Sequence, residues 1–190
     1  MKTVIYLIYG LLILCIVYRF FVLLTKMKQP IMYPVREEEQ SSLRVYPQNI
    51  IQSPRPNQQK AGIVLYLLMI LYLVAVIILE YYFKSISWPL LFLAFVPYFQ
   101  LQQVFNMFAV VEGGILCGGR FIHWQSIKGY EWTEINQNHR FYGYGEEVNH
   151  GYELRFKLKP LYFPAYVVVT DKKVKQRLTE LLDQQMETNN

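Results

Sequence analysis

The chain has 190 residues and a formal net charge of +5, and 53% of its residues are hydrophobic. The length suits one ordinary soluble domain, but long apolar runs within residues 1–106 exclude that class and predict an integral membrane protein. The charge does not predict nucleic-acid binding, because residues 1–106 carry nine basic and four acidic side chains whereas residues 107–190 carry ten of each. The excess lies in the membrane half, where topology explains it.

Three apolar runs are predicted to cross the membrane, at about residues 4–24, 61–79 and 86–106. The first holds one charge, Arg19, near its end, where the side chain can reach the lipid head groups. The third run alone would suit a re-entrant or interfacial segment, because it is interrupted by prolines and followed by amides: Pro89, Pro97, Gln100, Gln102, Gln103 and Asn106. Read through to about residue 106 it reaches spanning length, so we predict three spans.

Residues 25–60 join the first two spans and carry six basic side chains: Lys26, Lys28, Arg36, Arg44, Arg55 and Lys60. The positive-inside rule therefore places this segment in the cytoplasm. The N-terminus and the turn 80–84 are then outside, and residues 107–190 are cytoplasmic. No small-x-small cleavage site follows the first apolar run, which is interpreted as a retained signal anchor.

The cytoplasmic segment 25–60 is rich in Pro, Gln and Ser and has too few clustered apolar residues for a core of its own. We interpret it as a tether. The alternative is a docking segment for a partner, with Ile50, Ile51 and the Tyr-Pro pairs at 33–34 and 46–47 as anchors.

From Met107 the pattern changes to short β-rich runs separated by glycine pairs, which predicts strands joined by tight turns. Strands are expected at 107–111, 115–117, 120–124, 127–132 and 165–170. The clearest alternation is at 152–159, where apolar Tyr152, Leu154, Phe156 and Leu158 alternate with Glu153, Arg155, Lys157 and Lys159, so one face of that strand is expected to be wet.

A terminal helix is predicted after Asp171, which is a plausible N-cap. Its apolar stripe is spaced as expected for an amphipathic helix: Val174, Leu178, Leu181 and Leu182. The predicted fold class is thus three membrane spans plus a small α+β domain at 107–190, with a curled antiparallel sheet or barrel closed by a C-terminal amphipathic helix.

Part of this domain resembles bacterial membrane proteins with a pleckstrin-homology-like domain. The resemblance rests on Gly-Ile at 114–115, Arg-Phe-Ile-His-Trp at 120–124, Ser-Ile at 126–127 and Tyr-Glu-Trp at 130–132, and it covers about 107–185. It implies a barrel plugged by the terminal helix, in a family without an assigned function. Inositide-binding members of the wider superfamily have basic residues around the first hairpin, whereas this chain has Glu112-Gly113-Gly114, so phosphoinositide recognition is not expected.

No motif predicts catalysis or a metal site. The run 113–120 is glycine-rich but lacks the Gly-Lys-Ser/Thr of a phosphate-binding loop. The histidines match no common ligand spacing, although His139 and His150 flank a loop with Glu146 and Glu147 that could gather a metal. We expect that loop, 140–149, to be polar and mobile. Cys117 beside His123 is a weak nucleophile candidate, because no orienting group is evident, and no disulfide with Cys15 is expected.

Basic side chains provide the candidate contact residues. Four lie in the first half of the terminal helix, where the helix dipole disfavours positive charge, and three share one strand face: Lys172, Lys173, Lys175, Arg177, Arg155, Lys157 and Lys159. Anionic lipid head groups could offset the four helix charges.

The sequence predicts a multi-pass plasma-membrane protein with its N-terminus outside and a cytoplasmic C-terminal domain. Its expected role is a non-enzymatic interaction module without a cofactor, which recruits a protein or contacts anionic lipid. The alternative is an accessory subunit of a membrane transporter or enzyme complex, in which Gln100, Gln102 and Gln103 form interhelical hydrogen bonds. An enzyme with a membrane-borne site is not expected, because the predicted spans lack acidic and histidine residues.

Overall fold

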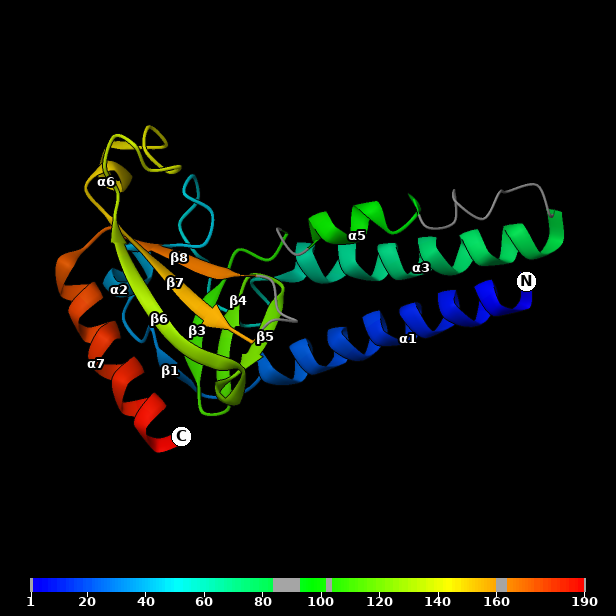
Figure 1. Cartoon of the computed structure of the whole chain (residues 1–190), viewed down its shortest axis with the longest axis horizontal. Coiled ribbons are helices and arrows are strands. Elements are labelled where there is room, and N and C mark those ends of the chain that lie inside the picture. The colour runs from blue at the N-terminus through cyan, green and yellow to red at the C-terminus, as the bar shows by residue number, and fades with distance from the viewer. Residues whose placement is uncertain (1, 84–92, 102–103, 160–163, 190) are drawn as a thin grey trace.

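The computed structural model describes residues 2–83, 93–101, 104–159 and 164–189. Two long helices, α1 (Lys2–Lys26) and α3 (Lys60–Phe83), project side by side from a small sheet domain. The N-terminus lies at the far end of the helices and the C-terminus lies on the sheet domain (Figure 1). The segment between the two helices and the C-terminal half of the chain lie at the same end of the helix pair.

The surfaces of α1 and α3 are strongly apolar and exposed. Only 22% of the most apolar window of each helix is buried, and Leu7, Leu14 and Leu71 are 70%, 69% and 64% exposed. Contiguous apolar surface of this extent is unfavourable in water, which separates these helices from the core helices of a soluble protein. The predicted helices at 4–24 and 61–79 are confirmed, and both are long and apolar enough to cross a bilayer.

The prediction of three spanning helices is wrong for the described residues. Two helices there are long enough to cross a bilayer, and the predicted span 86–106 lies partly outside the described chain. Its described part contains the six-residue helix α5 (Val96–Leu101), which packs against α3 and lies nearer to the sheet domain than to the far end of α3 (Figure 1). Pro97 at the second position of α5 is tolerated there, because the first turn of a helix has no internal use for that N–H.

Two four-stranded antiparallel sheets form the domain. Sheet A has the order β1-β3-β4-β5, and sheet B has the order β2-β8-β7-β6. The strands that run consecutively in the C-terminal half are β3 (Phe108–Val111), β4 (Gly114–Cys117), β5 (Arg120–His123), β6 (Ile127–Glu134), β7 (Tyr152–Leu158) and β8 (Ala165–Val169). A single turn of 3-10 helix, η1 (Trp124–Ser126), joins β5 to β6. The predicted strands are all confirmed, with boundaries within a residue or two.

Glycine makes the tight turns of sheet A. The two-residue turns expected between β3 and β4 and between β4 and β5 are both present. A Cβ atom on Gly114 would lie 2.1 Å from the carbonyl oxygen of Ile122, so no other residue fits at that close approach. Gly118 has a φ of 58°, which is the left-handed conformation that the second hairpin requires.

The interpretation of residues 25–60 as a tether is wrong for its central part. This segment supplies β1 (Ile31–Tyr33), which pairs with β3, and β2 (Leu43–Arg44), which pairs with β8. A short helix, α2 (Glu37–Ser41), lies between them. The apolar residues of segment 25–60 are buried in the core that it shares with the C-terminal half, not in a separate core: Tyr33, Leu43, Val45 and Ile51. The segment and the C-terminal half therefore fold as one unit.

The expected closed barrel is also not formed. No strand pairing joins sheet A to sheet B within the described chain, and each sheet keeps two edge strands. The sheets instead face each other across an apolar core that includes Phe108, Ile115, Leu154 and Phe156.

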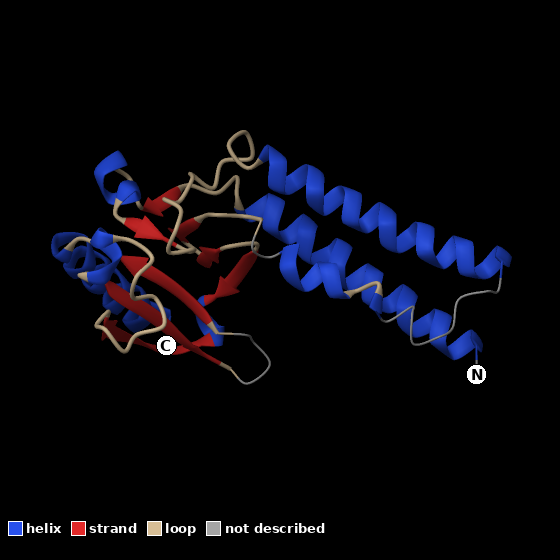
Figure 2. Ribbon diagram, turned by 90° about the horizontal axis from the view of Figure 1, so that it is seen from above, coloured by secondary structure: helices blue, strands red, loops and turns tan. Residues whose placement is uncertain are grey.

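The terminal helix α7 (Lys172–Asn189) covers this core as predicted. Val174, Leu178 and Leu182 of its apolar stripe are buried, and Leu181 packs against the same cluster. The Asp171 side chain caps the helix by accepting hydrogen bonds from the backbone N–H groups of residues 173 and 174, at 2.6 and 3.4 Å. Both views place α7 on the side of the strands away from the long helices (Figures 1 and 2).

A second core attaches the domain to the helices. All four residues of β3 and of β4 are buried, because one face of sheet A meets the domain core and the other meets the helix pair. Ala109, Val111 and Leu116 belong to this second cluster, together with residues of the helices and their connections: Phe20, Leu23, Met27, Tyr66, Met69, Phe105 and Met107. The Tyr66 ring stacks on Phe20 at 4.5 Å between centroids. The sheet domain is therefore packed directly against the helix pair.

Candidate functional site

Two of the four predicted cations of α7 contact other parts of the domain. The Lys175 ammonium lies 3.8 Å from the centroid of the Tyr152 ring and 5.5 Å from that of Trp132. An ion pair of 2.7 Å joins Arg177 Nη1 to Glu39 Oε1 of α2. These aromatic and acidic partners offset the unfavourable position of positive charge near the helix N-terminus. Lipid is therefore not needed to explain these two charges.

The other two cations, Lys172 and Lys173, are exposed at the start of α7. This end of α7 lies near α6 (Glu146–Asn149), at the end of the domain farthest from the long helices (Figure 1). We call this region, with its exposed side chains Tyr142, Tyr144, Lys172 and Lys173, the distal end. It lies a full domain away from the point at which α1 and α3 meet the sheets.

The three cations predicted on β7 differ in their surroundings. Lys157 Nζ lies 3.0 Å from Glu131 Oε2 of the neighbouring strand, and this hydrogen-bonded ammonium lowers the pKa of the Glu131 carboxyl. Arg155 Nη2 lies 3.6 Å from Glu153 Oε1. Lys159 is exposed at the end of the strand. Two of the three thus pair with carboxylates on their own sheet.

The helix cations and the strand cations lie on opposite faces of sheet B. Leu154 and Phe156 point into the core that α7 covers, so Arg155 and Lys157, at the alternate positions, point to the outer face. The structure therefore does not bring the seven predicted contact residues together into one surface.

Glu153 was expected on the wet face of β7 but has only 1% side-chain exposure. His139 Nε2 lies 2.8 Å from its Oε2, and Arg140 Nη2 lies 2.5 Å from its Oε1. The His139 Nδ1 atom accepts a hydrogen bond from the backbone N–H of Phe141 at 3.2 Å. With Nδ1 accepting, the Nε2–H of the neutral ring donates to the Glu153 carboxylate.

The expectation of a mobile polar loop at 140–149 is not supported, because this loop folds onto the outer face of sheet B. It forms a small third core there, consisting of Ile135, Phe141, Val148 and Val168, with Tyr166 packed against it. The Arg140 guanidinium stacks over the Phe141 and Tyr166 rings, 4.4 Å from each centroid. The signal that sequence reasoning missed is the pair of aromatic and aliphatic residues, Phe141 and Val148, within a polar stretch.

The candidate metal ligands are not gathered. His139 faces Glu153, and Glu147 forms an ion pair with Arg44 of β2. Within the residues that the structure describes, no group of three or more His, Cys, Asp and Glu side chains could hold a metal ion.

Cys117 does not face His123. In the β4–β5 hairpin Cys117 is paired with Arg120, whereas His123 is paired with Gly114. The Cys117 thiol is buried, 3.6 Å from the carbonyl oxygen of Tyr166, and this burial raises its pKa to about 11. A buried, protonated thiol is a poor nucleophile.

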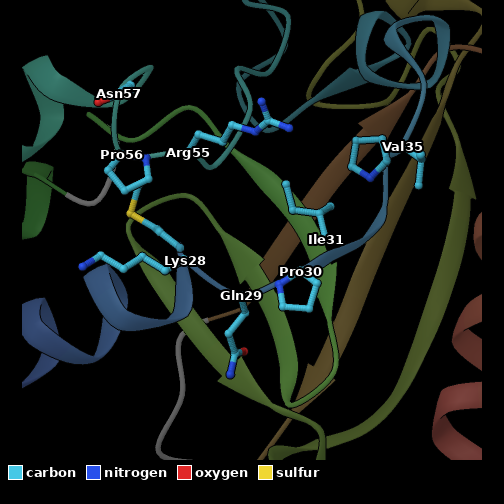
Figure 3. Close-up of a pocket in the computed structure, with 10 residues that line it drawn as sticks. Lys28, Gln29, Pro30, Ile31, Val35, Arg55, Pro56 and Asn57 are labelled. Atoms are coloured by element: carbon cyan, nitrogen blue, oxygen red, sulfur yellow. The ribbon is translucent and has the colours of Figure 1, made fainter.

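A pocket that sequence reasoning did not find lies where α1 and α3 meet the sheet domain. It has a volume of about 560 Å³ and is lined by ten residues: Met27, Lys28, Gln29, Pro30, Ile31, Pro34, Val35, Arg55, Pro56 and Asn57. Lys28 and Gln29 extend from the chain just after α1, whereas Arg55 to Asn57 come from the turn before α3 (Figure 3). Two segments that are far apart in the sequence thus build one pocket at the base of the helices.

The polar groups of this pocket are cationic or amide groups. Lys28 and Arg55 provide positive charge on different sides of it, and Ile31, Pro30 and Val35 provide apolar wall (Figure 3). None of the ten described lining residues is acidic. The turn that carries Arg55 is fixed by hydrogen bonds from the backbone N–H groups of residues 58 and 59 to its carbonyl oxygen, at 2.9 and 3.3 Å.

No protein-family model, characterised protein or solved structure matches the chain. Function must therefore be argued from the molecule itself.

Proposed function

We propose that the chain is a membrane-anchored, non-enzymatic interaction module that presents its distal end to a protein partner at the cytoplasmic face of the plasma membrane. The observation that carries this proposal is the second core, which packs sheet A directly against α1 and α3. A domain fixed in this way holds one end at the bilayer and the opposite end toward the solvent.

The chemistry of the distal end favours a protein partner over lipid. Tyr142 and Tyr144 are 41% and 49% exposed in the loop that leads to α6, and Lys172 and Lys173 are exposed at the start of α7. Exposed tyrosine is typical of protein interfaces, because the ring supplies apolar area and its hydroxyl remains able to hydrogen-bond. Lipid contact by α7, the other prediction, is disfavoured because α7 lies on the side of the domain away from the helices (Figure 1).

The proposed cytoplasmic placement follows from charge. Lys26, Lys28, Arg55 and Lys60 lie at the domain end of the helix pair, whereas the far end of α1 carries one basic residue, Lys2. The positive-inside rule assigns the basic end to the cytoplasm. Because residues 31–51 pair with the C-terminal strands, the whole sheet domain is on that side. We further propose that the domain belongs to the pleckstrin-homology-like class, on the basis of two antiparallel sheets and a C-terminal helix over their core.

An accessory subunit of a transporter or enzyme complex is the second candidate. The exposed apolar side chains of α1 and α3 could contact partner helices as well as lipid. Of the amides on which this alternative was based, Gln102 and Gln103 lie outside the described residues. If this candidate is right, replacing Gln100, Gln102 and Gln103 by leucine should abolish association with the partner complex and leave distal-end contacts unchanged.

Site-specific photo-crosslinking in living cells tests the proposed function. A benzoylphenylalanine in place of Tyr144 or Lys172 should give a discrete protein adduct. The matched control is the same group in place of Tyr82, which is 74% exposed at the far end of α3 and should give none of that adduct. Lipid adducts alone at Lys172 would contradict the proposal and restore the lipid-contact prediction.

A further inference from the structure

We propose that the pocket at the base of the helices binds the head group of an anionic phospholipid. This inference rests on the same membrane placement as the proposed function but not on any protein partner. It concerns different residues from the lysines of α7, on which lipid contact was predicted from the sequence.

The position of the pocket matches the level of the head groups. Its first lining residue, Met27, directly follows α1, and Asn57 precedes α3 by three residues. Both helices lose their apolar character at this end, where Lys26 and Lys60 lie. A pocket between these two helix ends therefore opens at the boundary between hydrocarbon and water.

Its charges attract an anionic head group, and they come from two side chains, Lys28 and Arg55, that point in different directions (Figure 3). Lys28 and Arg55 are exposed cations on two sides of the pocket (Figure 3). The described residues that line the pocket include no acidic side chain. The acidic residues nearest in sequence lie in α2, outside the lining: Glu37 and Glu38 are exposed, and Glu39 is held by Arg177 and by backbone N–H groups of residues 35 and 36, at 2.9 and 3.1 Å. The positive charge of the pocket is thus not neutralised from within its own lining.

Its remaining groups match the rest of a head group. Ile31, Pro34 and Val35 provide apolar contact for the upper part of the lipid. The volume of about 560 Å³ is within the roughly 300–1,000 Å³ typical of small-molecule sites.

The affinity of the purified full-length chain in non-ionic detergent for dioctanoyl phosphatidylglycerol tests this inference, with dioctanoyl phosphatidylcholine as the zwitterionic reference. In the Lys28→Gln/Arg55→Gln variant, the ratio of the affinity for phosphatidylglycerol to that for phosphatidylcholine should fall about thirtyfold, as expected for the loss of two cationic contacts with an anionic lipid. The matched control, Lys172→Gln/Lys173→Gln, removes the same charge from the distal end and should keep the preference. Native mass spectrometry counts the bound lipids.

A second variant separates the pocket from its charge. Val35 is 69% exposed at the pocket, so Val35→Trp should fold normally and fill the space while every charge remains, and it should weaken phosphatidylglycerol binding at least tenfold. Unchanged binding in Lys28→Gln/Arg55→Gln or in Val35→Trp would overturn the inference, as would an equal loss in the distal control. Inorganic phosphate or glycerol phosphate binding as tightly as the lipid would also overturn it and would identify a site for a free anion. The pocket variants should not change photo-crosslinking at the distal end, so failure of this inference would leave the proposed function standing.

Discussion

Glu153 is the outward-facing residue of β7 whose environment differs most from what its position suggests. Its neighbours on that face, Arg155 and Lys157, are 51% and 60% exposed, whereas Glu153 is 1% exposed under loop residues His139 and Arg140. A strand pattern of alternating apolar and polar residues fixes which face a side chain occupies, but it cannot show that a distant loop covers part of that face.

Replacing Glu153 by Gln should destabilise the domain by about 1–3 kcal/mol, because the buried neutral amide cannot accept hydrogen bonds from both His139 and the Arg140 guanidinium as the carboxylate does. The midpoint of thermal unfolding of the detergent-solubilised chain measures this effect. Glu131→Gln is the control, since Glu131 is 55% exposed in its pair with Lys157 and the change should have little effect. Equal midpoints for both variants would contradict the buried cluster.

Cys117 should be unreactive in the folded protein. Its thiol is buried with a pKa of about 11, so at pH 8 only about one thiol in a thousand is ionised, and reagents cannot reach it. In a Cys15→Ser chain, maleimide labelling should be at least a hundredfold slower in the folded protein than after denaturation. Rapid labelling of the folded chain at neutral pH would show that sheet A is more open than described.

At the scale of elements, the short strands of residues 25–60 matter most. Composition suggested a tether, because Tyr33, Leu43, Val45 and Ile51 are scattered among Pro, Gln and Ser. Two- and three-residue strands have no periodicity to detect, and these apolar residues are buried only because the C-terminal strands provide the rest of the core. Pairing between strands that lie this far apart in the chain, such as Leu43 with Val169, cannot be inferred from local sequence.

A tether and an integral strand respond differently to truncation of a side chain. Leu43→Ala should cost about 2–5 kcal/mol, because Leu43 is 0% exposed in the domain core. Ile50→Ala is the control in the same segment, since Ile50 is 48% exposed and should change stability little. No difference between the two thermal midpoints would restore the interpretation of the segment as a tether.

Strong local signals were sufficient for the hairpins of sheet A and for α7. The glycine pairs were sufficient to predict the turns. Asp171 and the apolar stripe of the residues after it were sufficient to predict the helix. Asp171→Ala should lower stability by about 1 kcal/mol through loss of the N-cap, whereas Asp171→Ser should retain most of it. Thermal unfolding compares the two variants, and an alanine variant as stable as the serine variant would contradict the cap.

At the scale of the whole molecule, the described residues correct two predictions: they contain two spanning helices rather than three, and their sheets do not close into a barrel. The apolar composition of residues 86–106 indicates that this segment avoids water. Composition alone cannot distinguish a spanning helix from a short helix such as α5 that packs against α3. The pocket at the helix ends was also beyond sequence reasoning, because Lys28 and Arg55 come to line one pocket only through the packing of the two helices on sheet A. Those positive charges were attributed to topology alone.

The central claim is that residues 25–60 and the C-terminal half lie together on the cytoplasmic side of the membrane. Single cysteines in place of Gln48 and Lys172, in a chain with Cys15→Ser and Cys117→Ser, test it most directly, because both positions are exposed. With a membrane-impermeant maleimide, both should be labelled only after the cells are permeabilised. Labelling of either position in intact cells, or a different response at the two positions, would contradict the account.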